Sequence, residues 1–156
     1  MSPVRERTLR FEDVAVGDAL PELAVPLNRT LIVATAIATR DYQDVHHDPS
    51  LAHERGSEDI FMNILSTNGF VGRFVTDWAG PAAIVRSIAI RLGAPNYPGD
   101  TMVLTGEVTE LSAPGPEAPS GRGVVTVAIR GRNGRGFHVT GTARVSLPSR
   151  DEIDVA

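Results

Sequence analysis

The amino-acid sequence predicts an α+β fold in which one long helix is followed by antiparallel strands. Two observations support this class. Apolar residues recur at close to helical spacing over residues 57–78. After Pro81 the pattern changes to shorter apolar stretches separated by turn residues, and Asn133-Gly134 is a strong signal for a β-hairpin. A long helix followed by a set of strands is typical of the α+β class.

The segment that precedes the long helix is predicted to begin with a strand at residues 25–31. Residues 32–42 are rich in Ala and Thr and are predicted to form a short helix. Within it, Val33, Ala36 and Ile37 occupy positions i, i+3 and i+4, which places them on one inward face.

A second short helix is predicted from residues 48–50 to Glu54. Aspartate or serine can cap its N-terminus, and proline suits its first turn. Gly56 ends this helix.

The long helix is predicted to start at Ser57 or Ile60 and to end at Trp78. Two acidic residues near its start, at positions 58 and 59, favour the positive end of the helix dipole. Gly80-Pro81 stops the helix. Its apolar positions, at close to 3.6-residue spacing, are Phe61, Ile64, Leu65, Val71, Val75 and Trp78.

Four strands are predicted after the helix. The loop at residues 93–100 and the loop at residues 112–123 are rich in Pro and Gly. We therefore expect residues 1–156 to form a single domain with its core at about residues 9–147 and a flexible tail after residue 148. The predicted strands are residues 84–92, 102–111, 124–132 and 137–147.

The composition excludes several classes of function. The 156 residues carry a formal net charge of −4 without a basic stretch, which argues against a nucleic-acid partner. The chain has no cysteine, so disulfides, thiolate nucleophiles and cysteine metal sites are excluded. No segment reaches the ~18 apolar residues needed to span a membrane. The charged N-terminus lacks the apolar stretch of a signal peptide, and a cytoplasmic location is expected.

Asp41 and His46 are the candidate catalytic residues. They lie five positions apart, with an extended stretch between them. A carboxylate and a neutral imidazole in this arrangement can hold one water molecule from two sides. One group can remove a proton while the other orients the water or returns the proton, as the addition of water to a double bond requires. The same spacing also occurs in surface turns, so the residues around the pair decide between the two interpretations.

Residues 41–49 resemble the motif of the (R)-specific enoyl-CoA hydratases of the MaoC-like family, which have the hot-dog fold. In that motif an aspartate is followed, after four residues, by a histidine, and then by one residue and Asp-Pro. Asp41, His46 and Asp48-Pro49 match it. The chain departs from the motif where the family has Gly, Asn and Pro, at Arg40, Gln43 and Asp44.

The resemblance extends beyond the motif. Residues 11–18 resemble the opening segment of the family, and residues 96–101 resemble the loop that leads into its third strand. Together these matches cover most of residues 9–147. Residues 40–49, 54–61 and 75–80 resemble in particular the small catalytic subunit of the heteromeric MaoC-like hydratases of bacterial steroid side-chain degradation.

The resemblance implies an enoyl-CoA hydratase, a lyase that adds water across the double bond of a trans-2-enoyl-CoA in a β-oxidation-like pathway. A bulky, steroid-type acyl group is the expected substrate of the heteromeric group. His46 would be the principal base toward the water, and Asp41 would hold the water and protonate the α-carbon. The two roles are exchangeable because such a pair titrates as a unit.

A backbone donor is implied in the same way. In the family a His-Gly pair opens the central helix, and a backbone N–H there polarises the thioester carbonyl. The matching pair is Met62-Asn63, so the backbone N–H of Asn63 is the candidate oxyanion donor. The alternative for Asn63 is a purely structural role as the helix cap.

The resemblance also implies the partners. A single hot-dog domain leaves a sheet edge exposed, and exposed edges invite pairing. The family joins two such domains edge to edge with the acyl tunnel between them. We therefore expect an acyl-CoA thioester as substrate and a second hot-dog subunit as partner, in a homodimer or a heteromer. No metal, flavin or nucleotide cofactor is implied, since CoA is part of the substrate.

Two other functions compete with the hydratase. A hot-dog acyl-CoA thioesterase would also present an acid near the helix and an N–H at its start, and the Asp41–His46 spacing favours the hydratase. A non-catalytic subunit that completes a partner's tunnel would not need either residue. A metal site at His46-His47-Asp48 lacks a further histidine upstream. Arg73, Arg86 and Arg91 are candidates for contact with the CoA phosphates, and the sequence does not choose among them.

Overall fold

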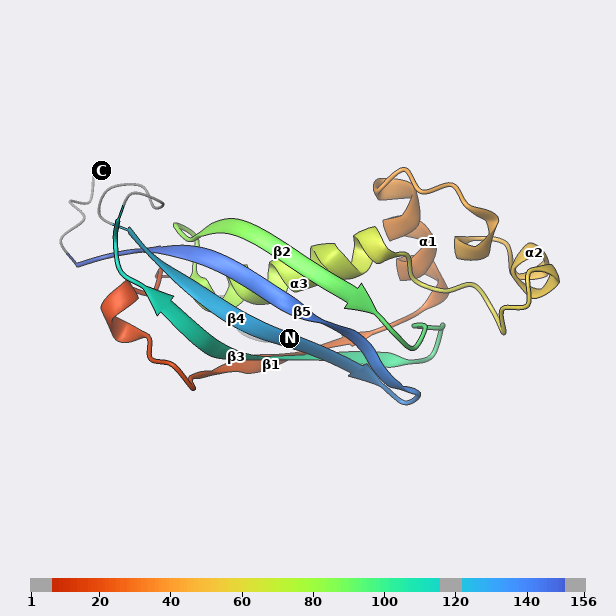
Figure 1. The fold of residues 1–156 in the computed structure, drawn as a ribbon. Coiled ribbons are helices and arrows are strands. Elements are labelled where there is room, and N and C mark those ends of the chain that lie inside the picture. The colour runs from red at the N-terminus through yellow and green to blue at the C-terminus, as the bar shows by residue number, and fades with distance from the viewer. Residues whose placement is uncertain (1–6, 116–121, 151–156) are drawn as a thin grey trace.

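Five antiparallel strands form a sheet that curves around one long helix, α3, in the computed structural model, which describes residues 7–115 and 122–150 (Figure 1). The strand order in the sheet is β1-β3-β4-β5-β2. The strands are β1 (Ala19–Pro26), β2 (Ile84–Leu92), β3 (Thr101–Ser112), β4 (Arg122–Asn133) and β5 (Gly136–Pro148). The helices are α1 (Arg29–Ala38), α2 (Pro49–Glu54) and α3 (Ile64–Ala79), with single 3-10 turns η1 (Phe11–Asp13) and η2 (Asp44–His46).

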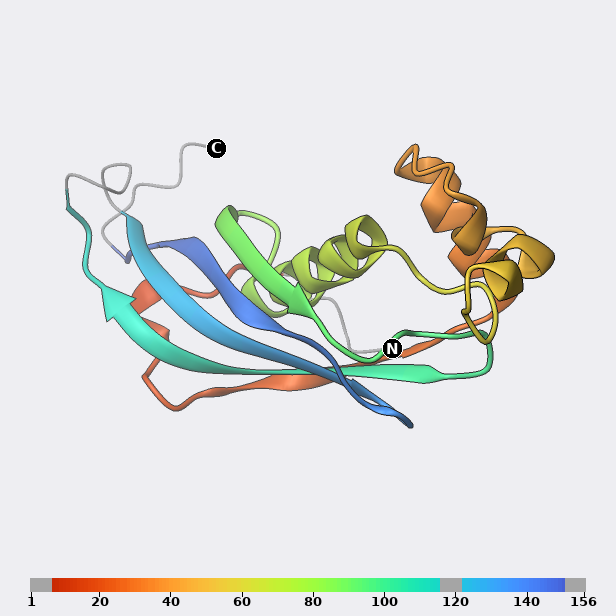
Figure 2. The ribbon, with the colours of Figure 1, turned by 45° about the vertical axis from the view of Figure 1, so that its right-hand side comes forward.

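The sheet curves because four of its pairings contain a register shift. The extra residues lie in β1 between Leu20 and Leu23, in β2, in β3 and near the start of β5, at His138. Bulges of this kind bend a strand and increase its twist. The turned view shows α3 lying on the concave side of the curved sheet (Figure 2).

Helix α3 fills the concave side with a stripe of buried side chains. Val71, Phe74 and Val75 are at most 2 % exposed. A Cβ atom added at Gly106 of β3 would come within 3.0 Å of the Phe74 ring, so the glycine allows the helix to approach the sheet. Gly80, with φ of 96°, ends α3 as predicted.

The predicted start of α3 is wrong. The helix begins at Ile64, not at Ser57 or Ile60, because the preceding segment is held by other elements. Asp59 pairs with Arg29 of α1, and the backbone N–H of Met62 donates to the Asn96 carbonyl at 3.0 Å. Ile64 and Leu65, predicted on the apolar stripe, are each 48 % exposed.

The predicted strand at residues 25–31 is also wrong. The strand, β1, lies earlier, and α1 begins at Arg29 because the side chain of Asn28 accepts the Leu31 N–H at 2.8 Å and caps the helix. The helix predicted for residues 32–42 is present in part: α1 spans Arg29–Ala38 and ends four residues earlier than predicted, because the N–H groups of Arg40 and Asp41 turn back to the last carbonyls of the helix. Its inward face holds Ile32 and Ala36, whereas Ile37 is 55 % exposed.

The remaining elements confirm the α+β class. α2 is capped by Asp48, and β2 matches its predicted residues. β4 and β5 pair up to Asn133 and Gly136, as the hairpin signal predicts. The loop predicted at residues 112–123 lies partly outside the described residues, as does the tail after residue 150. Ser149 is buried and Arg150 pairs with Asp13, so the described part of the predicted tail is held in place.

Among residues 7–115 and 122–150, no helix combines the length and apolar character needed to cross a membrane.

Candidate active site

Asp41 is placed by the way α1 ends. The Arg40 N–H donates to the Ile37 carbonyl and the Asp41 N–H donates to the Ala36 carbonyl, both at 3.0 Å. These two bonds form a Schellman motif, which requires a left-handed residue at the position of Arg40. Arg40 has φ of 58°, and among the described residues it is the one non-glycine residue with a positive φ. The family motif has glycine at this position, and glycine adopts a left-handed conformation freely. Arg40 adopts the same conformation, so the chain keeps the turn that presents Asp41.

His46 is fixed by Phe61. Its Nδ1 lies 2.7 Å from the Phe61 carbonyl oxygen, and the two rings meet edge to face with centroids 5.0 Å apart. A carbonyl only accepts hydrogen bonds, so Nδ1 carries a proton and donates it. In the neutral ring this leaves the lone pair on Nε2, which lies 3.3 Å from Oδ2 of Asp41. The structure therefore brings the two predicted residues together across the atoms that a catalytic pair would use.

Asn63 joins the pair through its side chain. Its Oδ1 accepts the Ser66 N–H at 2.8 Å, so the predicted capping role is present. Its Nδ2 donates to Oδ2 of Asp41 at 3.0 Å and to Oγ1 of Thr39 at 2.9 Å. The sequence had pointed only to the backbone N–H and the cap, and it gave no signal for the contact with Asp41, which lies 22 positions earlier.

The contacts of Asp41 hold its pKa below the usual value of 3.8. The hydrogen bond from Asn63 is the largest cause, followed by partial burial, which acts in the opposite direction. The backbone N–H of Gln43 and the charge of His46 lower the pKa further. The carboxyl side chain is 17 % exposed, and it is ionised at neutral pH.

The pair opens into a hollow of about 320 Å³. Its walls come from η2, the segment before α3, the start of α3, the end of β2 and the start of β5. The lining residues are Asp41, Gln43, Val45, His46, Phe61, Met62, Asn63, Ile64, Leu92, Gly93, Ala94, Pro95 and His138.

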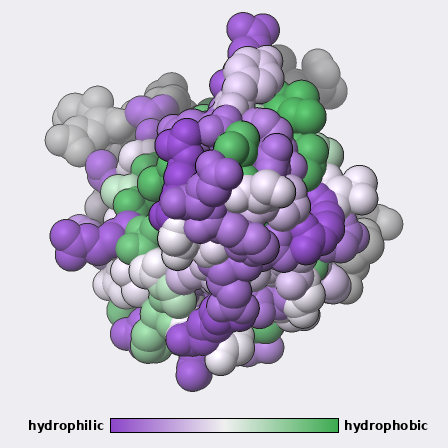
Figure 3. Space-filling view, turned by 90° about the vertical axis from the view of Figure 1, so that its right-hand side faces the viewer, coloured by the Kyte–Doolittle hydropathy of each residue, from purple (hydrophilic) through white to green (hydrophobic). Residues whose placement is uncertain are grey.

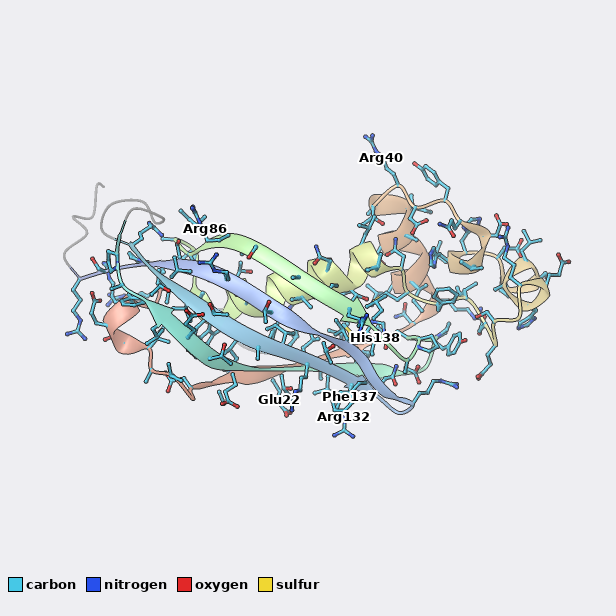
Figure 4. All side chains as sticks on the ribbon, in the orientation of Figure 1. Glu22, Arg40, Arg86, Arg132, Phe137 and His138 are labelled. Carbon is cyan, nitrogen blue, oxygen red and sulfur yellow. The ribbon has the colours of Figure 1, made fainter. Side chains whose placement is uncertain are left out.

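His138 is a wall residue that was not among the candidates predicted from the sequence. Its Nδ1 lies 2.7 Å from the Ala94 carbonyl oxygen and its Nε2 lies 2.9 Å from Oγ1 of Thr67 on α3. Burial lowers the pKa of His138, so the ring is neutral and Nε2 accepts the hydroxyl proton. Alternation along the sequence offered no signal for it, because the register shift in β5 leaves both His138 and Val139 buried. The preceding residue, Phe137, is exposed (Figure 4).

The other polar candidates lie outside the hollow. His47 is exposed, and within the described residues no cluster of three or more His, Asp or Glu side chains could hold a metal ion. Arg73, one of the candidates for CoA contact, donates to Asp77 at 3.2 Å. Arg86 lies near the start of β2, at the far end of that strand from His138 (Figure 4).

Comparison with known proteins identifies relatives of high similarity. No protein-family model matches the chain. The β subunit of the 3-oxo-4,17-pregnadiene-20-carboxyl-CoA hydratase of Mycobacterium tuberculosis is 50 % identical over 132 residues, which cover 85 % of this chain and 95 % of the relative.

Solved structures support the same relationship. A chain of the ChsH1–ChsH2 complex of M. tuberculosis superposes with a TM-score of 0.76 at 50 % identity, over 85 % of this chain and 98 % of that chain. The MaoC-like dehydratase of Rhodospirillum rubrum has a TM-score of 0.75 at 26 % identity, over 91 % and 98 % of the two chains. The R-hydratase PhaJ1 of Pseudomonas aeruginosa shares the fold, with a TM-score of 0.77 at 21 % identity over 91 % and 87 %. These neighbours confirm the predicted hot-dog fold.

Proposed function

We propose that this chain, which belongs to the MaoC-like hydratase family, adds water across the double bond of a trans-2-enoyl-CoA with a steroid-type acyl group. The observation that carries this proposal is the contact of 3.3 Å between His46 Nε2 and Asp41 Oδ2, with Nδ1 committed to a carbonyl. The substrate class is supported by the 50 % identity to a subunit of a hydratase that acts on a pregnadiene-carboxyl-CoA.

The pair would move one proton from the water to the α-carbon. His46 Nε2 accepts a proton as the water oxygen bonds to the β-carbon, and the double-bond electrons move to the thioester oxygen. The proton passes across the 3.3 Å contact to Asp41, which delivers it to the α-carbon as the enolate collapses. Because the pKa of Asp41 is lowered, its protonated form is a stronger acid than an ordinary aspartic acid side chain and gives up the proton more readily. The opposite division of roles uses the same atoms.

The enolate oxygen needs a donor, and we assign this role to the backbone N–H of Asn63. Asn63 caps α3, so this N–H lies at the positive end of a helix of 16 residues. A preorganised donor of this kind is typically worth ~10²-fold or more in turnover. The scheme requires no metal, flavin or nucleotide, and the compartment that we propose is the cytoplasm.

We propose that the partner is a second hot-dog subunit. The two would form a heteromer like the ChsH1–ChsH2 complex, which contains the related chain. β2 is an edge strand, with Ile84 and Val85 at least 36 % exposed. Its last residue, Leu92, and half-exposed Ile64 line the hollow, so a partner along β2 would extend the hollow. The end of the molecule that carries α1 and α2 is mainly hydrophilic, with hydrophobic areas toward its margins (Figure 3).

The volume of the hollow supports a shared tunnel. About 320 Å³ lies at the lower end of the ~300–1,000 Å³ of pockets that bury a drug-sized ligand. This volume suits the reacting end of an enoyl thioester. A steroid ring system together with pantetheine needs additional space, which the partner would provide.

The test is to incubate the chain, alone and with a co-expressed partner, with crotonyl-CoA and with the steroid enoyl-CoA. Loss of enoyl absorbance without release of free thiol is expected, with steroid turnover only in the heteromer. Release of thiol would indicate a thioesterase. If neither preparation shows a loss of enoyl absorbance or a release of thiol, the proposal is contradicted.

A further inference from the structure

We infer that the side chain of Asn63 is a positioning residue for Asp41, which it holds in place through a hydrogen bond of 3.0 Å from Nδ2 to Oδ2. The inference deepens the proposed function and rests on it. It is separate from the oxyanion role, which uses the backbone of the same residue. Where the family motif has glycine, this chain has an amide side chain that reaches the catalytic carboxylate.

The orientation of the Asn63 amide follows from its four neighbours. Its Oδ1 faces two donors, the N–H and the hydroxyl of Ser66. Its Nδ2 faces the Asp41 carboxylate, which at neutral pH only accepts, and Oγ1 of Thr39, whose own proton goes to the Thr35 carbonyl at 2.9 Å. A flipped amide would place oxygen against oxygen on one side and N–H against N–H on the other. The donor toward Asp41 is therefore fixed by chemistry.

Burial makes the contact strong and costly to lose. Asn63 is 2 % exposed, so the loss of its contact with Asp41 would leave a buried N–H group without that partner. Asp41 receives few other donors, since the Gln43 N–H is 3.4 Å from Oδ1. Without Asn63, the carboxylate would depend on this long bond and on a protonated His46.

The groups that face Asp41 come from three elements. His46 belongs to η2, Asn63 is the N-cap of α3, and Thr39, which also accepts from Asn63, and Arg40 follow the end of α1. Of these groups, His46 and Arg40 have ionisable side chains. Removal of the Asn63 donor should raise the pKa of Asp41, because that bond is the largest cause of its lowering. The acid limb of the pH–rate profile should then move to higher pH.

Two variants separate this role from helix capping. Asn63→Ser and Asn63→Asp both keep a good N-cap, and neither can donate to Asp41 as the amide does. Asn63→Asp also places a second carboxylate beside the first. Asn28→Ala is the matched control, because it removes the cap of α1 without touching Asp41.

The expected result is a loss of kcat of about 10- to 100-fold in both Asn63 variants, the range for a hydrogen bond to a charged group. KM should change little, the acid limb should rise, and Asn28→Ala should retain turnover. In parallel, NMR titration of the Asp41 carboxyl carbon should give a higher pKa in both variants than in the unmodified chain.

The NMR titration tests the positioning role independently of the reaction. An unchanged Asp41 pKa in both Asn63 variants overturns the inference, whatever the activity. If the Asn63 variants have a normal kcat while Asp41→Asn is inactive, the inference about Asn63 is overturned and the proposed function stands. An Asp41→Asn variant with full activity overturns the proposed function and the positioning role together.

Discussion

Replacing Arg40 with glycine should increase the free energy of unfolding of the chain. Its φ of 58° is a left-handed conformation that costs an L-residue roughly 1–2 kcal/mol, whereas glycine adopts it freely. Arg40→Gly removes this cost but increases the entropy of the unfolded chain, which offsets about 0.4–1 kcal/mol. The net gain is about 1 kcal/mol, and a chain of this size should then show a rise in Tm of about 2–4 °C.

Denaturant unfolding and thermal unfolding both measure this gain. Arg40→Ala is the matched control, because alanine removes the guanidinium and keeps the strained φ. Arg40 is exposed and points away from the sheet (Figure 4), so the alanine variant should lie within about 0.5 kcal/mol of the unmodified chain. Equal gains in both variants would show that the side chain, not the backbone, is responsible. A lower Tm for Arg40→Gly would refute the strain argument.

Three further predictions follow from the site. Asp41→Asn and His46→Ala should each lower turnover by about 10²-fold or more, the double variant should be little worse than either, and His47→Ala should retain activity, all measured by loss of enoyl absorbance. Asn63→Pro, which deletes the backbone donor, should abolish turnover with a folded circular-dichroism spectrum, and a turnover equal to that of Asn63→Ser would contradict the oxyanion role. The pKa of His138 is lower in the folded chain than its ordinary value of 6.5, so below about pH 6.5 the unfolded chain binds a proton that the folded chain does not. Stability should therefore fall as pH decreases below about 6.5, and His138→Gln should show a smaller fall in urea titrations between pH 7 and 5.

The parts of the fold that the sequence predicted well are specified by local signals. The β4–β5 hairpin follows from Asn133-Gly134, and α2 follows from Asp48-Pro49, whose carboxylate caps the helix in the structure. Both signals act between residues close in the chain. The same holds for the spacing of Asp41 and His46, which one turn, η2, is enough to bring face to face.

The errors arose where distant residues decide the conformation. The apolar pattern of α3 continues back to Phe61, and its acidic residues suit a helix start. Yet Asp59 is used by Arg29 and Met62 is bonded to Asn96, contacts that join segments 30 and 34 positions apart. Ile64 and Leu65 carry the periodicity of a core face, but both side chains are half-exposed, and Ile64 lines the hollow. Periodicity identifies an apolar face and does not say what covers it.

The charge of Asp41 shows why a motif alone does not define this candidate site. Asp41 follows the C-terminus of α1, where the helix dipole disfavours an anion. It lies beside the N-terminus of α3, where the dipole and the Asn63 amide favour one. The pKa of Asp41 is lowered, and the largest cause is the hydrogen bond from Asn63, which lies 22 positions along the chain. A relative with the same aspartate and histidine but no donor at the position of Asn63 would match the motif and still hold its aspartate less firmly ionised. The donor at the start of α3 therefore has to be considered together with the Asp–His spacing when the activity of such chains is predicted.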